Sequence, residues 1–313
     1  MYQSTYNVGH AVNPDYEGLS RPLYLIRACG VVTDWQDAAR IRNYVLAELG
    51  ASIPLSCHPI VMTEPLYVPH PQQTDDPRTK TAMMSEVFEY FPAPAFYTTV
   101  PAVLSTYAAN LPTALVVDSG YAAIDDWLQQ ALMNEVGVEL PSNEAWDIAL
   151  WLAKTERCRV AMNFEEESMR WKKSMYDGRQ DEVGELPDGL KMKPNTPLGG
   201  VSFKLSMLGL DFGGLQYDAF NIIMNCNRDI REEFCQNVLL AGGNTMFPGF
   251  GARLERELKG LFKEGTKINV ISPRNRAYSA WVGGSMLSEF STFEGMCVTR
   301  AEYEEAGPEI ANN

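Results

Sequence analysis

Hydrophobic residues along the chain recur at two spacings, one typical of helices and one typical of strands. The clearest helical stretch follows Thr33 or Asp34, either of which can cap it, and Gly50 can end it. Its apolar stripe has a spacing near 3.6 residues and consists of Trp35, Ala38, Ile41, Val45 and Leu49. We therefore predict a helix here with this stripe as its apolar face.

Strand-like and helix-like segments alternate through much of the remaining chain. Short apolar runs predict strands over 59–63, 95–100, 113–117, 238–241 and 267–272. Helices are predicted over 81–91, 101–110, 215–237, 248–262 and 278–290. The stretch 122–170 reads as mostly helical, and the Gly- and Pro-rich stretch 172–200 as a surface excursion. This alternation indicates a layered α/β fold.

The composition narrows the classes of function. Hydrophobic residues make up 45% of the chain, and the formal net charge is −14, from 40 acidic and 26 basic residues. Such an acidic surface repels nucleic acid and anionic lipid, so we expect neither as a partner. The first residues lack a signal-peptide pattern and no apolar run reaches about 18 residues, so we expect no secretion signal and no membrane span.

Cysteine and histidine give little support for a metal site. The 6 cysteines are scattered without a CxxC pair, which favours reduced thiols in a cytosolic or nuclear compartment. None of the 3 histidines stands at metal-ligand spacing from a cysteine or another histidine. We expect no bound metal among these residues.

Residues 237–251 read NVLLAGGNTMFPGFG and contain the strongest candidate for a ligand site. An apolar strand ends in Gly242 and Gly243, whose missing Cβ lets the backbone approach a ligand closely. Thr245 supplies a hydroxyl, and Pro248 lies near the first turn of the next helix. A strand, a glycine turn and a helix N-terminus can together hold an anion or a nucleotide. A tight connection without a ligand explains the same pattern, so both readings stay open at this point.

This stretch closely resembles the signature segment of the actin family, whose glycine pair lies against the nucleotide. The similarity continues in register from about Tyr6 to the end of the chain. It includes the segments GVVTDWQDA, VMTEPL, VLSTYA, CRVAMNFEEE, ELPDG, FNIIMNCNRDIREEF and YSAWVGGSMLSEFSTFEGMCVTRAEYEEAGPEI. On these segments the chain is identified as a divergent member of that family, as opposed to the related sugar kinases and chaperone ATPases.

The resemblance implies the family's two-lobed, ribonuclease H-like α/β fold. It assigns 1–26 to a remnant of subdomain 2, 27–108 and 278–313 to an incomplete subdomain 1, 109–125 and 207–277 to subdomain 3, and 126–206 to a reduced subdomain 4. It also implies that the family's first phosphate hairpin and its insertion loop are missing, because no Asp-Asn-Gly-Ser-Gly-like loop precedes Tyr6.

Compared with the family, several positions of the nucleotide site are changed. The second phosphate hairpin begins as 116–120 but continues as Tyr-Ala-Ala, without the family's Asp-Gly and histidine strand. The family's water-orienting glutamine corresponds to Pro101, one adenine-side lysine to Ala277, and an adenine-side glutamate to Thr155. These changes imply that no catalytic residue remains and that actin-type ATPase activity is lost.

Part of the nucleotide site is retained, and the resemblance implies residual binding of ATP or ADP with Mg²⁺ at most. Beyond this residual binding, no cofactor is predicted. The matching positions are Asp118, Gly120, Lys154, Gly242, Gly243, Asn244 (threonine in the family), Thr245, Met246 and Phe247.

The resemblance also implies a partner groove. In the family an apolar cleft receives amphipathic helices of binding proteins and the insertion loop of a neighbouring subunit. The matching residues are Tyr107, Leu287, Phe290, Phe293 and Met296, for which an ordinary core role is the alternative reading. The implied partners are actin or other actin-family subunits and amphipathic helices of actin-binding proteins.

The function implied is that of a structural subunit without ATPase activity in a cytoskeletal or other actin-containing assembly, one that caps or decorates filaments. It would lie in the cytoplasm with the cytoskeleton, with the nucleus as a second compartment. The alternative is an ATP-binding, polymerising actin represented by a truncated or mis-spliced chain. A small-molecule kinase on the same fold has little support, because no sugar-site carboxylate is visible.

Overall fold

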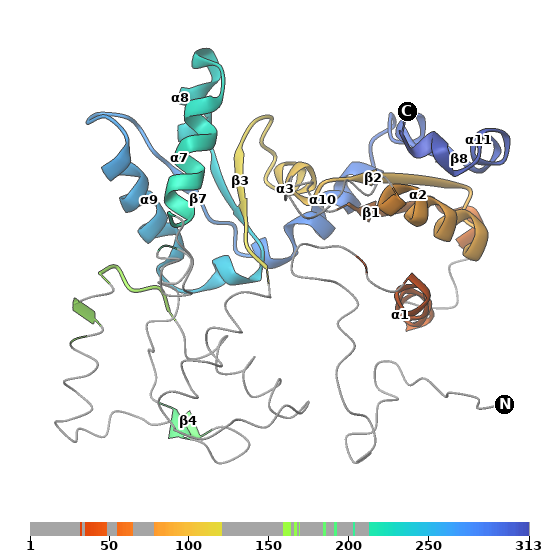
Figure 1. The fold of residues 1–313 in the computed structure, drawn as a ribbon, viewed down its shortest axis with the longest axis horizontal. Helices are drawn as coiled ribbons and strands as arrows, with labels where there is room; N and C mark the ends of the chain where they lie inside the picture. The colour runs from red at the N-terminus through yellow and green to blue at the C-terminus, as the bar shows by residue number, and fades with distance from the viewer. Residues whose placement is uncertain are drawn as a thin grey trace. The chain divides into compact units, whose positions relative to one another are not determined.

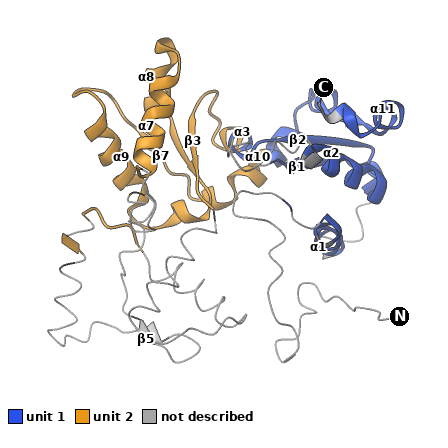
Figure 2. Cartoon of the chain, viewed as in Figure 1, with its two compact units in different colours: residues 1–104, 284–313 blue, residues 105–283 orange. Residues whose placement is uncertain are grey.

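Figure 1 shows the helices and strands of the protein in a computed structural model. The structure describes residues 32, 35–48, 55–64, 78–120, 159–163, 166–167, 169, 184–185, 191–192, 203 and 213–312. The chain divides into two compact units, coloured separately in Figure 2. Residues 1–104 and 284–313 form the first unit, and residues 105–283 form the second. The finer division into four subdomains stays a prediction.

The first unit contains a three-stranded mixed sheet in the order β1-β2-β8. Strands β1 (Ile60–Thr63) and β2 (Ala95–Thr99) are parallel, with Ile60 opposite Phe96. Strand β8 (Val298–Thr299) runs antiparallel to β2 and joins the C-terminal part of the chain to this sheet. The strands predicted over 59–63 and 95–100 are therefore confirmed to within a residue.

A second layer of the first unit is helical. Helix α2 (Arg78–Ser85) continues directly into the π-helix η3 (Glu86–Tyr90), and the pair matches the helix predicted over 81–91. Its apolar side chains form one buried cluster with Phe96 of β2 and Tyr303 of helix α11 (Arg300–Ala306). The rings of Phe88 and Tyr303 are stacked with centroids 4.7 Å apart. This cluster holds helix α11 against α2, η3 and strand β2.

Helix α1 (Trp35–Glu48) confirms the helix predicted after Thr33, and its predicted apolar stripe is confirmed in part, since Trp35 packs against the buried cluster of this unit. Ile41 and Val45 are exposed, whereas Ala38 and Ala39 are buried. On the same side of the helix, Arg42 forms an ion pair with the buried carboxylate of Glu86.

The second unit contains a parallel sheet in the order β3-β6-β7. Its central strand β6 (Val238–Ala241) is buried along its whole length, which is why it reads as a continuous apolar run. Strand β3 (Leu115–Asp118) pairs with β6 from Leu115–Val238 to Asp118–Ala241. Strand β7 (Val270–Ile271) is shorter than the stretch 267–272 predicted for it.

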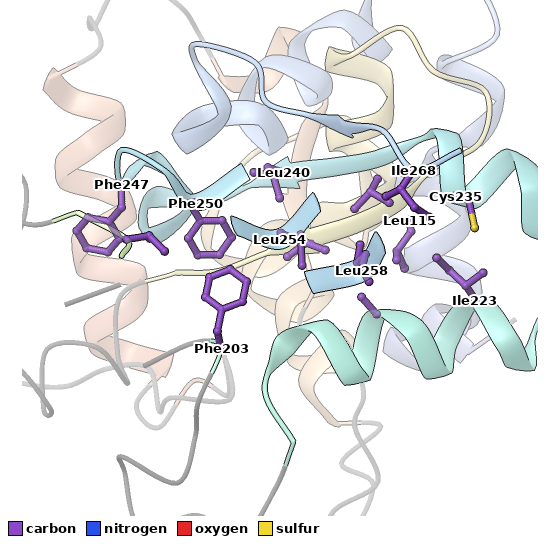
Figure 3. Close-up of a cluster of buried hydrophobic side chains, with 14 residues drawn as sticks. Leu115, Phe203, Ile223, Cys235, Leu240, Phe247, Phe250, Leu254, Leu258 and Ile268 are labelled. Carbon is purple, nitrogen blue, oxygen red and sulfur yellow. The ribbon is translucent and has the colours of Figure 1, made fainter. Parts of the chain in front are cut away.

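Two helices cover one face of this sheet. Helices α7 (Leu215–Asn225) and α9 (Phe250–Leu261) bury Ile223, Phe250, Leu254 and Leu258 against it. Figure 3 shows these side chains pointing toward Leu115 and Leu240 of the strands. The ring of Phe203 joins this core 5.2 Å from that of Phe250. The core fixes the carboxyl ends of β3 and β6, where the candidate site lies.

One helix prediction in the second unit is wrong. The stretch 215–237 is not a single helix, because the chain turns at Cys226 between α7 and α8 (Arg228–Gln236). Cys226 is extended, with φ −72° and ψ 164°, and its carbonyl accepts a hydrogen bond from Arg231 Nε at 2.9 Å. Asn residues on either side of Cys226 favour such a break, since their side chains compete with helical hydrogen bonding.

The remaining described elements are short. The helices predicted over 101–110 and 278–290 appear as α3 (Pro101–Ala108) and α10 (Ser279–Ser288), and α9 begins two residues after the predicted position. Strands β4 (Gly184–Glu185) and β5 (Lys191–Met192) form a two-stranded antiparallel ribbon within the predicted surface excursion. The helical reading of 122–170 falls mostly outside the described residues.

Candidate functional site

The candidate site lies where β3 and β6 end side by side in the second unit. Asp118 is the last residue of β3 and stands opposite Ala241, the last residue of β6. The Ser119 N–H donates to the Ala241 carbonyl at 3.1 Å, so the two strands stay paired until their loops begin. In parallel α/β sheets ligands bind at this carboxyl edge, between the loops that follow neighbouring strands.

Gly242 is the residue that lets the two loops come together. It has φ +85°, in the left-handed region, and a Cβ built on it would lie 2.3 Å from Asp118 Oδ1 and 2.4 Å from the Ser119 carbonyl oxygen. No other residue type fits such a position without a shift of the backbone. Gly243, in contrast, is exposed, and nothing lies within 4 Å of its Cβ position. The first glycine serves packing, and the second leaves an open backbone surface.

Asn244 connects the glycine turn to the loop after β3. Its backbone N–H donates to the Ser119 carbonyl at 3.0 Å, and its side-chain amide donates to Ser119 Oγ at 3.3 Å and to the Gly120 carbonyl. The residue is buried, with 2% of its surface exposed. The Asn244 side chain therefore acts as a bridge within the site.

Thr245 is held from the other side by Arg276, which precedes helix α10. The Thr245 hydroxyl donates to the Gly242 carbonyl at 2.7 Å and lies 3.1 Å from Arg276 Nε. The Arg276 guanidinium also donates to the Thr245 carbonyl at 2.6 Å and to that of Pro273 at 2.9 Å. The Gly242 N–H in turn donates to the Arg276 carbonyl at 2.9 Å. Burial lowers the pKa of Arg276, which is consistent with its enclosed position.

The structure thus brings together most of the residues predicted for a residual nucleotide site. Asp118, Gly120, Gly243 and Met246 are exposed there, whereas Asn244, Thr245 and Phe247 are buried. Phe247 belongs to the core beneath the sheet rather than to an open surface. Lys154 and the continuation of the hairpin after Gly120 lie outside the described residues. The role of this set in nucleotide binding stays a prediction.

Asp118 is the acidic group of the site. Loss of hydration at the end of β3 raises the pKa of its carboxyl, even though the residue keeps an exposed edge. Because its pKa is raised in the folded state, the carboxyl of Asp118 favours folding in its protonated form. That stabilisation is fully present below the unfolded-state pKa of about 3.9 and is lost as the pH rises through the folded-state pKa.

We therefore expect Asp118→Asn to raise the melting temperature at pH 7 by roughly 1–2 °C, because the neutral amide removes this cost. The difference should vanish near pH 3, where both side chains are uncharged. Calorimetry at the two pH values measures it. Asp229→Asn in the exposed first turn of α8 is the matched control and should give no increase.

Two arginines that shape this unit were not predicted from any pattern in the sequence. Arg276 fastens Thr245, and Arg253 of α9 donates to the carbonyls of Ala161 and Met162, each at 2.7 Å. Arg253 also forms an ion pair with Glu257 at 2.7 Å. These arginines bind backbone carbonyls that are distant along the chain, so no spacing in the sequence reveals them.

The residues predicted for a partner groove do not share one environment. Leu287 and Phe293 are buried in the first unit, with 1% and 2% exposure, and Phe293 packs edge-on against Tyr97 at 5.9 Å. Phe290 and Met296 are exposed, with 48% and 40% exposure. Tyr107 belongs to the second unit. Two of the five therefore have the surroundings of core residues, and two are accessible to a partner.

In the part of the chain that the structure describes, no group of three or more His, Cys, Asp or Glu side chains is placed to hold a metal ion. Nor does any helix within these same residues have the length and apolar character needed to cross a membrane.

The fold and the site together define a two-unit α/β protein with a glycine turn at the carboxyl edge of a parallel sheet. A family model described as Actin matches residues 3–125 and 150–313. An "Actin-like protein" from Neurospora crassa is 28% identical over 332 residues, which cover 97% of this chain and 84% of that protein. The chain belongs to the actin family, whose fold has two lobes. The family model does not match residues 126–149.

Proposed function

We propose that this protein is a structural subunit of an actin-containing assembly that does not hydrolyse ATP. The observation that carries the proposal is the position of Pro101, the first residue of helix α3. The resemblance places the glutamine that orients the attacking water here. Proline suits the first helical position because its φ is fixed near the helical value, but it has neither a side-chain amide nor an N–H. Without a group that positions water, hydrolysis of the terminal phosphate loses a required part.

The adenine side of the site supports weakened binding. Ala277 stands where the resemblance implies a lysine, in the turn η7 (Arg276–Tyr278). Removing one charge-assisted hydrogen bond of about 1.5–3 kcal/mol weakens binding roughly 10- to 150-fold. Asn244 and Thr245, which lie in the same glycine turn, already use their side-chain donors on protein oxygens. ATP or ADP with Mg²⁺ is therefore at most a weak ligand of this site.

The partners that fit this proposal are actin-family subunits and amphipathic helices of actin-binding proteins, in the cytoplasm with the cytoskeleton or in the nucleus. The exposed Phe290 and Met296 supply apolar contact area for such a partner. A subunit that attaches to a filament end without hydrolysing ATP would cap or decorate the filament.

The test is to incubate the full chain with Mg²⁺ and ATP, and to measure phosphate release and the elongation of actin filaments. We expect release at the level of buffer, because Pro101 cannot position water, and slower elongation at amounts of chain well below those of actin. Actin alone is the positive control for both readings. Phosphate release at the rate of polymerising actin, or filaments formed by this chain alone, would instead support the alternative of a competent, polymerising actin.

A further inference from the structure

The loop after β3 receives both of its described side-chain hydrogen bonds from one residue, Asn244, beside the backbone hydrogen bonds of Ser119 with Ala241 and Asn244. Gly120 is exposed, and nothing lies within 4 Å of its Cβ position. Asn244 donates to the carbonyl of Ser119, to the hydroxyl of Ser119 and to the carbonyl of Gly120. Both side-chain amide hydrogens therefore bind the same dipeptide from a position 124 and 125 residues further along the chain.

Asparagine at position 244 supplies two side-chain donors, which is what the two acceptors of the loop require. An amide carries two N–H donors, whereas a threonine hydroxyl carries one. Two acceptors, Ser119 Oγ and the Gly120 carbonyl, are available to it. Because Asn244 is buried, an unused donor there would cost free energy, and the observed geometry leaves neither side-chain hydrogen unused.

The opposite flank of the glycine turn is closed as well. Arg276 binds the carbonyl and hydroxyl of Thr245 and accepts the Gly242 N–H on its own carbonyl. The turn is thus tied to the loop after β3 on one side and to the segment before α10 on the other. All of these ties are made by the protein itself, at the edge of a parallel sheet where a ligand would otherwise lie between the loops.

We propose that Asn244 is an internal clasp that holds the Ser119–Gly120 loop against the glycine turn, so that this edge of the second unit stays closed without any nucleotide. The clasp goes beyond the proposed function and does not depend on it, since a closed loop could belong to a subunit with or without ATPase activity. Its consequence is a Ser119–Gly120 loop that keeps the same contacts with the glycine turn at all nucleotide concentrations.

Hydrogen–deuterium exchange of the full chain without nucleotide tests the clasp, using the variant Asn244→Thr. Losing one or two hydrogen bonds of about 0.5–1.5 kcal/mol each should speed exchange at the amides of Ser119 and residue 244 roughly 2- to 150-fold. Amides of β1 and β2 in the first unit should be unchanged. Asn221→Thr on the exposed face of α7 is the matched control and should change neither set.

Two further arms keep the test decisive. If Asn244→Thr does not fold, Ser119→Ala removes one acceptor only, and should speed exchange at the same amides about 2- to 10-fold. Adding 5 mM ATP with Mg²⁺ to the unaltered chain should leave exchange at both amides unchanged. Equal protection in the Asn244→Thr and unaltered chains, or added protection by ATP, would overturn the clasp. Neither result depends on phosphate release, which decides the proposed function separately.

Discussion

Replacing Gly242 by alanine is expected to lower the free energy of unfolding of the second unit by about 3–5 kcal/mol, the largest single effect that we predict. Gly242 has φ +85° and ψ 154°, a combination that residues with a Cβ adopt only with strain. The added methyl would also lie 2.4 Å from the Ser119 carbonyl oxygen and 2.3 Å from Asp118 Oδ1. The backbone strain and the steric overlap of the methyl group both lower the stability of the folded state, so their costs add.

Relaxation around the new methyl group is restricted. Asp118 can rotate away, but the Ser119 carbonyl belongs to backbone that is held by pairing with β6. The Ser119 N–H donates to the Ala241 carbonyl, and the same Ser119 carbonyl accepts the Asn244 N–H. A shift large enough to admit a methyl group would therefore break at least one of these hydrogen bonds. For this reason we expect the effect to be near the upper end of what a single alanine produces.

Chemical denaturation followed by circular dichroism, or calorimetry, measures the loss of stability. Gly243→Ala is the matched control, because its Cβ would enter open space and its side chain would face solvent. The control should change the free energy of unfolding by less than about 1 kcal/mol. Equal effects of the two substitutions would show that the described approach of the two loops is incorrect.

This contrast between neighbouring glycines shows what the sequence could and could not predict. The sequence located the turn, because an apolar strand, a glycine pair and a following helix are local features. It treated Gly242 and Gly243 alike as residues that admit a ligand. Only the structure separates them, since the atoms that crowd Gly242 come from residues 118 and 119, more than a hundred positions away along the chain.

The same limit explains the site side chains. The sequence predicts a ligand-facing hydroxyl for Thr245, and the resemblance places Asn244 among the residual nucleotide-binding residues. Their partners are Arg276 and the loop after β3, which no spacing in the sequence connects to them. The buried strand of the second unit was predicted well because burial on both faces leaves a continuous apolar run, a signal that needs no knowledge of distant contacts.

Helix faces were predicted less well than helix positions. The position of α1 follows from local spacing and from capping residues, but no local pattern shows that Ile41 and Val45 are exposed or that Arg42 pairs with Glu86. The break between α7 and α8 was missed for a related reason. The periodic pattern continues across Cys226, while the backbone turns there and its carbonyl is bound by Arg231.

In the first unit, Arg300→Ala is expected to lower the free energy of unfolding by about 3–4 kcal/mol. The guanidinium donates to three carbonyls, those of Phe88 at 2.8 Å, Phe91 at 2.9 Å and Ala93 at 3.1 Å. These carbonyls lie at the end of the π-helix η3 and just beyond it, where helical partners are lacking. The guanidinium also lies over the Phe88 ring, 5.4 Å from its centre. Alanine would leave the carbonyls without their donor.

Chemical denaturation of the full chain measures this loss, and two further variants, Arg300→Lys and Arg274→Ala, are measured with it. Together they separate the effect of the charge from that of the guanidinium geometry. Lysine keeps the charge but has no planar fork to reach three carbonyls, so we expect it to recover less than half of the loss. Arg274 is exposed, and its replacement should change stability by less than about 0.5 kcal/mol. If Arg300→Lys were as stable as the unaltered chain, charge alone would account for the effect. A loss confined to Arg300→Ala and Arg300→Lys would instead show that the guanidinium stabilises the packing of the C-terminal helix α11 against the π-helix.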